Sequence, residues 1–136
     1  MPATLKLDVV TPEAVTFSGD VEMVTLPAVE GEMGVYPQHV PLMTQIVPGE
    51  LILRREGRDT SLVVGDGFVE ITSDHVAVLT DMAIPADQID EAKAEEARRR
   101  AEARLAERLD DEETATVHAA LANSMAQLFV KRHRRK

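Results

Sequence analysis

The chain has 136 residues, 44% of them hydrophobic and 29% charged, so it can bury one modest core and little more. It contains no cysteine, which excludes disulfides, thiolate metal sites and cysteine nucleophiles. The net charge is −9, and the longest apolar runs of four residues fall far short of the roughly 18 that suggest a membrane span.

The acidity belongs to one part of the chain. Residues 1–86 carry 13 acidic and 4 basic side chains, a net charge of −9, whereas residues 87–136 carry 11 of each and are neutral. An acidic surface repels phosphate groups, which disfavours nucleic acid and anionic lipid as partners of the first part. The N-terminal residues lack a basic stretch followed by an apolar core, so we expect no signal peptide and a cytoplasmic location.

All seven glycines and all seven prolines precede position 86, and short β-favouring runs lie between them. Many short strands separated by turn residues are typical of a sandwich or barrel. The sequence therefore predicts an all-antiparallel β-sandwich over residues 1–86. The expected strands are 5–10, 21–26, 43–47, 51–54, 60–64, 68–72 and 76–80, and the expected turns are 18–20, 48–49, 56–57 and 65–67.

Helix-forming residues dominate from 87 to 109 and from 113 to 130, which predicts an antiparallel two-helix hairpin over 87–136. Asp87 is the expected cap of the first helix, and Asp110 and Asp111 mark the turn. The expected apolar seam is rich in alanine, which buries little surface, so the hairpin should dock weakly. Its members are Ile89, Ala97, Ala101, Leu105 and Leu109 in the first helix, and Val117, Leu121, Met125 and Leu128 in the second.

Charged side chains on the first helix stand at a spacing that supports an isolated helix. Glu95 precedes Arg99 by four residues and Glu96 precedes Arg100 likewise, and each such pair contributes about 0.2–0.5 kcal/mol. We therefore expect a segment that is stable as helix but loosely attached to the sandwich.

The stretch EGEMGVYPQHVPLM at 30–43 closely resembles the central signature of the epsilon subunits of bacterial F-type ATP synthases. Flanking pieces agree in order and spacing, among them LDVV at 7–10, GDGFVEI at 65–71 and AALANSMAQL at 119–128. The resemblance covers essentially the whole chain.

This resemblance implies a ten-stranded sandwich followed by a helical hairpin, in a non-catalytic central-stalk subunit of a proton-translocating complex. It implies contacts of the sandwich with the c-ring and the gamma subunit. It also implies a hairpin that can extend toward the catalytic alpha and beta subunits and restrain ATP hydrolysis. The implied location is peripheral, on the cytoplasmic face of the bacterial inner membrane, without insertion into the bilayer.

For the segment from Glu30 to Pro41 the resemblance implies a rotor interface, with Glu32, Tyr36 and His39 as contact residues. Turn chemistry alone accounts for its glycines and prolines, so a purely structural turn is the alternative.

The resemblance also extends to a motif with which some members bind a regulatory ATP. The motif-like run IDEAKA at 89–94 supplies Ile89, Asp90 and Lys93, and Arg100 is a further matching basic position. Lys93 stands where the motif has arginine, and lysine lacks the planar fork that holds phosphate with two hydrogen bonds. A helix start with a capping acid and solvated charges is the alternative interpretation.

The C-terminal run KRHRRK carries five fixed positive charges in six residues. We expect Lys131, Arg132, Arg134 and Arg135 either to engage an acidic surface of the catalytic subunits or to form a solvated terminus.

Three rival functions remain open on the sequence. The first is a plain mechanical subunit and the second an ATP-sensing module. The third is a nucleic-acid binder acting through Arg98–Arg100, Arg104 and Arg108, which the interleaved glutamates and four aromatic residues disfavour. No histidine has metal-ligand or catalytic spacing, so we expect neither a metal nor an active site.

Overall fold

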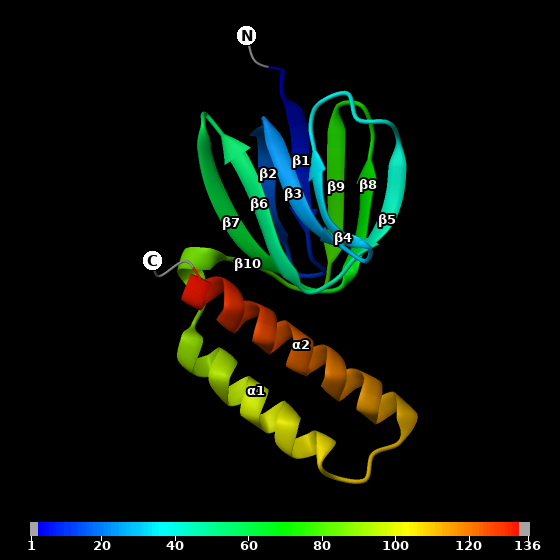
Figure 1. Ribbon diagram of the computed structural model, residues 1–136, viewed down its shortest axis with the longest axis vertical. Helices are drawn as coiled ribbons and strands as arrows, with labels where there is room; N and C mark the ends of the chain where they lie inside the picture. The colour runs from blue at the N-terminus through cyan, green and yellow to red at the C-terminus, as the bar shows by residue number, and fades with distance from the viewer. Residues whose placement is uncertain (1–2, 134–136) are drawn as a thin grey trace.

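Ten β-strands stack in two layers above a two-helix hairpin in the computed structural model, which describes residues 3–133 (Figure 1). This architecture confirms the predicted sandwich followed by two helices. The strands are β1 Leu5–Val10, β2 Val15–Val21, β3 Met23–Ala28, β4 Gly31–Val35, β5 Leu42–Ile46, β6 Gly49–Arg55, β7 Arg58–Val64, β8 Gly67–Ile71, β9 His75–Thr80 and β10 Ala83–Pro85.

The strand order is β10-β7-β6-β3-β5-β8-β9-β1-β2, with β4 paired to β3. β3 and β5 share a single pair, Ala28 with Ile46, and there the sheet passes from one layer to the other. β1 runs parallel to β9, with Leu7 opposite Val76, so the prediction of an all-antiparallel sheet is wrong at this pair. Strands joined by a tight turn must be antiparallel, but β1 and β9 are far apart in the chain and can therefore pair in parallel.

One predicted turn is wrong, and another connects two strands that do not form a hairpin. The 18–20 segment lies inside β2, where Gly19 stands opposite Leu7. The 65–67 segment is not a hairpin turn, because β7 pairs with β6 and β10 whereas β8 pairs with β5 and β9. The predicted turn at 56–57 is correct: Glu56 and Gly57 both have positive φ, 53° and 76°, as the two-residue turn between β6 and β7 requires.

The core between the layers consists of leucine, isoleucine and valine side chains that alternate with outward-facing residues along each strand. Burying such a side chain fully contributes about 1.5–3 kcal/mol, so this cluster dominates the stability of the fold. Its fully buried members include Leu7, Val9, Val21, Val24, Leu26, Val35, Ile46, Leu51, Val64, Val69, Val76 and Val78.

The hairpin consists of α1 Glu91–Leu105 and α2 Asp111–His133, preceded by a 3-10 turn at Ala86–Gln88. The predicted cap, Asp87, lies in that turn; the cap is Asp90, whose carboxylate accepts a hydrogen bond of 3.1 Å from the Lys93 N–H. α2 begins two residues earlier than predicted, because the carboxylate of Asp110 accepts from the Glu113 N–H at 2.7 Å. Neither described helix is long and apolar enough to cross a membrane.

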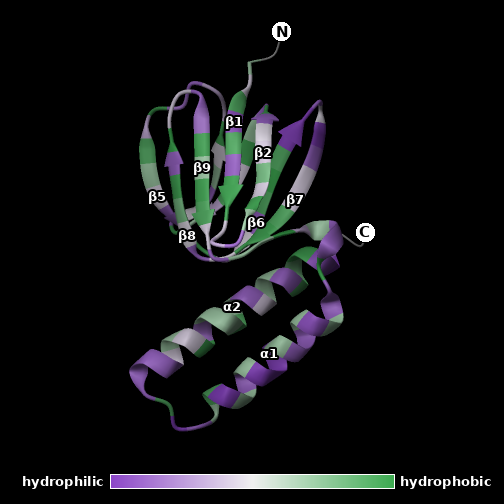
Figure 2. Cartoon of the chain, turned by 180° about the vertical axis from the view of Figure 1, so that it is seen from behind, coloured by the Kyte–Doolittle hydropathy of each residue, from purple (hydrophilic) through white to green (hydrophobic). Residues whose placement is uncertain are grey.

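α2 lies between the sandwich and α1, and it carries most of the contact with the sandwich (Figure 1). Val63 of β7, Ile89 and Val130 form a small buried cluster at this junction. Figure 2 shows that hydrophobic and hydrophilic residues are mixed along the strands of the sandwich, whereas α1 is mainly hydrophilic. The hairpin covers the outward side of β7 at Val63, and this apolar side chain is therefore fully buried.

Between the two helices the buried side chains are few and mostly small. Ala94 and Ala101 of α1 and Ser124 and Leu128 of α2 are buried, whereas Met125, predicted to lie in the seam, is 53% exposed. The predicted ladder pairs are present, at 3.8 Å between Glu95 and Arg99 and at 2.9 Å between Glu96 and Arg100.

Among residues 3–133 two cations join the helices, and one of them, Arg104 of α1, lies 3.3 Å from Glu113 of α2. Arg132 near the end of α2 reaches across to two acids of α1, at 2.9 Å from Glu91 and 2.8 Å from Glu95. These pairs cross 41 and 37 residues of chain, so helical spacing could not predict them.

Candidate partner-binding surfaces

Large apolar side chains are exposed on the outer side of the β5–β8–β9 layer. Phe68 stands directly opposite Leu79, and Met43 lies diagonally across from Phe68 on the neighbouring strand. They are 66% (Met43), 58% (Phe68) and 57% (Leu79) exposed. We call these three residues the apolar face; grouped exposed side chains of this size mark interaction surfaces rather than ordinary solvent contact.

Polar side chains gather on the same side of the sheet, at β1, β2 and β9. Asp8 accepts hydrogen bonds from Ser18 Oγ at 2.6 Å and from His75 Nε2 at 2.8 Å. These bonds, with that of Ser18 first, hold the pKa of Asp8 below its usual value. Sequence spacing missed this cluster because His75 is 67 residues from Asp8 and is brought beside it by the parallel pairing.

The order of the three groups in this cluster decides its chemistry. In a catalytic triad the imidazole stands between the hydroxyl and the carboxylate and takes the hydroxyl proton. Here the carboxylate of Asp8 stands in the middle, and Ser18 donates to it. The arrangement therefore does not activate a nucleophile.

The predicted rotor-contact residues lie on β4 and on the segment that follows it. Glu32 lies near the start of β4 and Tyr36 directly after its end, and both are exposed, about 13 Å apart along an extended chain. His39 is half-buried, and its Nδ1–H donates to the Val40 carbonyl at 2.6 Å. The structure thus does not gather the three residues in one site.

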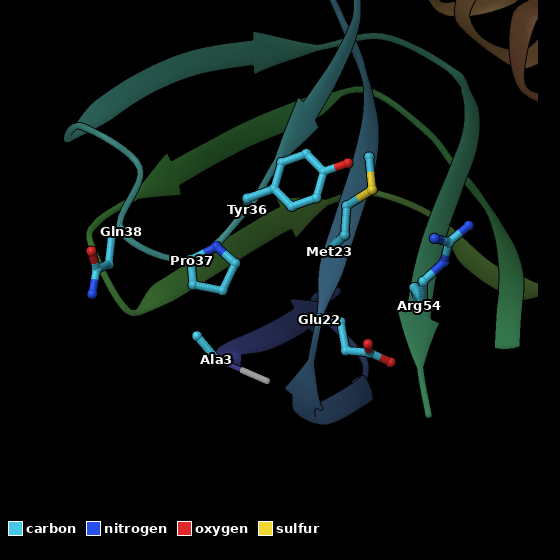
Figure 3. A pocket seen from close by; sticks show the side chains of 7 residues that line it. All are labelled: Ala3, Glu22, Met23, Tyr36, Pro37, Gln38 and Arg54. Atoms are coloured by element: carbon cyan, nitrogen blue, oxygen red, sulfur yellow. The ribbon is translucent and has the colours of Figure 1, made fainter. Parts of the chain in front are cut away.

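Tyr36 borders a shallow hollow of about 410 Å³ at the end of the sandwich away from the hairpin (Figure 3). Glu22 and Arg54 line its other side. Both have partners outside it, since Glu22 accepts from the Gly57 N–H at 2.8 Å and Arg54 pairs with Asp59 at 2.9 Å. The hollow therefore does not gather unpaired charge of one sign.

The residues matched to the ATP motif do not converge in this conformation. Ile89 is buried against the sandwich and Asp90 caps α1, while Lys93 is exposed and Arg100 is paired with Glu96. The neighbouring hollow is lined by Glu91, Glu95 and Glu96 as well as by Arg99 and Arg132, and the acids would repel phosphate. ATP binding stays an untested prediction.

The predicted inhibitory residues lie at the end of α2. Lys131 is half-buried and Arg132 holds the two acids of α1, whereas Arg134 and Arg135 lie outside the described residues. Four of the five arginines considered for nucleic acid are paired with glutamates: Arg98, Arg99, Arg100 and Arg104. Within residues 3–133 no three His, Asp or Glu side chains are grouped as metal ligands.

Family models cover both parts of the chain. The β-sandwich domain of the ATP synthase Delta/Epsilon chain matches residues 4–86, and the long alpha-helix domain of that chain matches residues 87–131. The chain belongs to the ATP synthase Delta/Epsilon family. The family inferred from residues 30–43 and their flanking motifs is therefore confirmed.

Relatives agree over nearly the full length. The ATP synthase epsilon chain of Chromobacterium violaceum is 46% identical over 126 residues, which cover 91% of this chain and 90% of the relative. That of Laribacter hongkongensis is 43% identical over 128 residues, which cover 93% and 91%.

Two solved structures share the fold. A chain in the cryo-EM structure of the Euglena gracilis mitochondrial ATP synthase, with OSCP, F1 and the c-ring, aligns with a TM-score of 0.76 at 26% identity. The match covers 93% of this chain and 80% of that one. A chain of the Tetrahymena thermophila mitochondrial ATP synthase central stalk and c-ring aligns with a TM-score of 0.63 at 14% identity, covering 95% and 96%.

Proposed function

We propose that this chain is a non-catalytic subunit of the central stalk of a proton-translocating F-type ATP synthase. The sandwich joins the c-ring to the gamma subunit, and the hairpin acts on the catalytic alpha and beta subunits. The subunit works as a peripheral protein at the cytoplasmic face of the bacterial inner membrane. Family membership and the relatives named epsilon chain support this role.

The apolar face is the observation that carries the proposal. Three large apolar side chains exposed side by side on an antiparallel layer are unfavourable in water, and a partner that covers them removes this unfavourable exposure. The gamma subunit is the partner we assign to this face, and the Asp8–Ser18–His75 cluster beside it provides polar groups for the rim. We assign Glu32, Tyr36 and His39, along β4 and the segment after it, to contacts with the c-ring and gamma.

Co-purification with gamma tests the assignment. Phe68→Glu together with Leu79→Glu places two charges on the apolar face, and we expect co-purification to be lost while the isolated chain keeps its fold, because both side chains are exposed. Met125→Glu, at a comparably exposed site on α2, is the matched control and should still co-purify. Retention of gamma by the double variant would overturn the assignment.

The hairpin's action on hydrolysis has its own test. Five positive charges at 131–136 would attract an acidic surface of the catalytic subunits when the hairpin extends. Deleting residues 131–136 in an assembly competent for hydrolysis should raise ATPase activity at low ionic strength, and less at high salt because the attraction is screened. Unchanged activity at low ionic strength would contradict this part of the proposal.

A nucleotide sensor is the alternative, and calorimetry separates it from a mechanical subunit. Absence of binding heat when the isolated chain is titrated with millimolar ATP would remove the sensor. Heat that disappears in Lys93→Ala and Arg100→Ala would establish it.

A further inference from the structure

One side of α2 carries two large apolar side chains that stay exposed while the hairpin is docked on the sandwich. Met125 is 53% exposed and Phe129 is 63% exposed, and the Phe129 ring stacks on the His133 ring with the centroids 5.6 Å apart. A hollow of about 560 Å³ lies between these residues and Arg98 of α1. Grouped apolar side chains of this size on a surface helix mark a place where another molecule binds.

These residues belong to one continuous side of the helix. With about 3.6 residues per turn, one side of α2 bears positions 111, 115, 118, 122, 125, 129 and 133. All of them are exposed except Ala122, which is half-buried. The buried residues Ser124, Leu128 and Val130 lie elsewhere around the helix. We call the seven positions the open side of α2.

The two halves of the open side differ in the size of their apolar side chains. Toward the start of α2 the apolar residues are Ala115 and Ala122, whereas toward the end they are Met125 and Phe129. Large side chains on one helix pack best against small ones on a facing helix, because the two surfaces then interdigitate without voids. A second copy of α2 laid antiparallel sets the large half of each helix against the small half of the other.

The two ends of α2 differ in charge, and in the sense that fits the same arrangement. The first turn is acidic and the last turn basic, with Asp111, Glu112 and Glu113 at one end and Lys131, Arg132 and His133 at the other. An antiparallel second copy brings each acidic end beside a basic end, whereas a parallel copy would set like charges together. The open side is therefore complementary to itself in size and in charge, and only in the antiparallel orientation.

We propose that the open side of α2 is a self-association surface, on which two copies of this chain pair through antiparallel α2 helices. Position 122 is midway between 111 and 133 and between 115 and 129, so Ala122 faces its own counterpart at the twofold axis of a symmetric dimer. One helix pair buries a small interface, so the dimer should form reversibly and depend on concentration. This surface is separate from the apolar face assigned to gamma, so either assignment can fail without the other.

Sedimentation equilibrium of the isolated full chain over a range of concentrations measures the dimer. Phe129→Glu removes the largest side chain of the open side and places a charge close to the acidic end of the second copy. We expect the dissociation constant of the dimer to rise about tenfold or more. Phe68→Glu, at a site on the sandwich that is 58% exposed, is the matched control and should leave the constant unchanged.

Single introduced cysteines report the orientation of the helices, since the chain itself contains none. A disulfide forms only where the two Cα atoms lie within about 7 Å. Ala122→Cys should cross-link two copies on oxidation by copper phenanthroline, because both thiols lie at the twofold axis. Ala115→Cys should stay uncross-linked, because antiparallel pairing places the two copies of position 115 about 21 Å apart along the helices.

Three results would refute the proposal. The first is a chain that stays monomeric at every concentration, and binding of such a monomer to the catalytic subunits that is lost in Phe129→Glu would assign the open side to them instead. The second is a dimer that Phe68→Glu disrupts and Phe129→Glu does not, since the copies would then meet through the apolar face. The third is cross-linking of Ala115→Cys, which requires parallel helices.

Discussion

The sandwich and the hairpin are held by different forces. Inside the sandwich, large aliphatic side chains are fully buried between two layers, whereas the helices meet through alanines, a serine and surface ion pairs. Apolar burial contributes free energy in proportion to area, and ion pairs at the surface contribute little. The comparison teaches that apolar burial stabilises the sandwich, whereas small side chains and ion pairs make up the contact between the two helices.

A cavity in the core should have the largest effect. Leu53→Ala removes a side chain that is 1% exposed, and we expect the free energy of unfolding to fall by about 2–5 kcal/mol. Denaturant unfolding followed by circular dichroism measures it. Leu79→Ala, 57% exposed, is the control and should leave the midpoint nearly unchanged.

Loss of the junction cluster should have a smaller and more local effect. Ile89→Ala empties the space between Val63 and Val130, and docking of the hairpin should weaken by about 1.5–3 kcal/mol. Hydrogen exchange should become faster in α2 while β1 and β9 keep their protection. Equal acceleration in both regions would show that hairpin and sandwich unfold as one unit.

Acid should weaken the sandwich partly through Asp8. Since the pKa of Asp8 is lowered in the folded chain, its contribution to stability is complete above the ordinary value of 3.8 and is lost as pH falls below it. Asp8→Asn should therefore be less stable than the parent at neutral pH, with the difference shrinking below pH 3.8. Thermal unfolding at a series of pH values measures this, and a constant difference would contradict it.

The smallest effect is expected at the ion pairs between the helices. Arg132→Gln removes the contacts with Glu91 and Glu95 and should loosen the end of α2 only at low ionic strength. In about 1 M salt, where the screening length is about 3 Å, parent and variant should behave alike. Amide exchange of residues 125–130 measures the difference, and Arg99→Gln, a weaker pair at 3.8 Å, is the matched control.

Local signals predicted much of the fold. The turn at Glu56–Gly57, the two helices and the ladders from Glu95 and Glu96 all depend on residues close in the chain, and all are present. The N-cap of α1 is Asp90 and not the predicted Asp87, because Ile89 takes an extended conformation that buries its side chain on the sandwich. The strand predicted at 5–10 is present as β1, but β2 was missed because Gly19 is a turn residue by type and a strand residue by pairing.

The candidate surfaces were less predictable than the fold. Glu32, Tyr36 and His39 were predicted from the resemblance. The apolar face of Met43, Phe68 and Leu79 was not predicted, because the side of the sheet on which a strand residue lies is known only once the strand register is known.

The sequence by itself determined the class of this protein: the sandwich, the hairpin and, through residues 30–43, the family. These depend on turn chemistry, helix propensity and local motifs, all readable along the chain. Only the tertiary structure decided the parallel β1–β9 pair and the Asp8–Ser18–His75 cluster. It also decided the ion pairs of Arg132 with Glu91 and Glu95, and the position of Asp81 and Asn123 beside Gly65. Each joins residues far apart in sequence, where no periodicity constrains distance and packing alone brings the groups together.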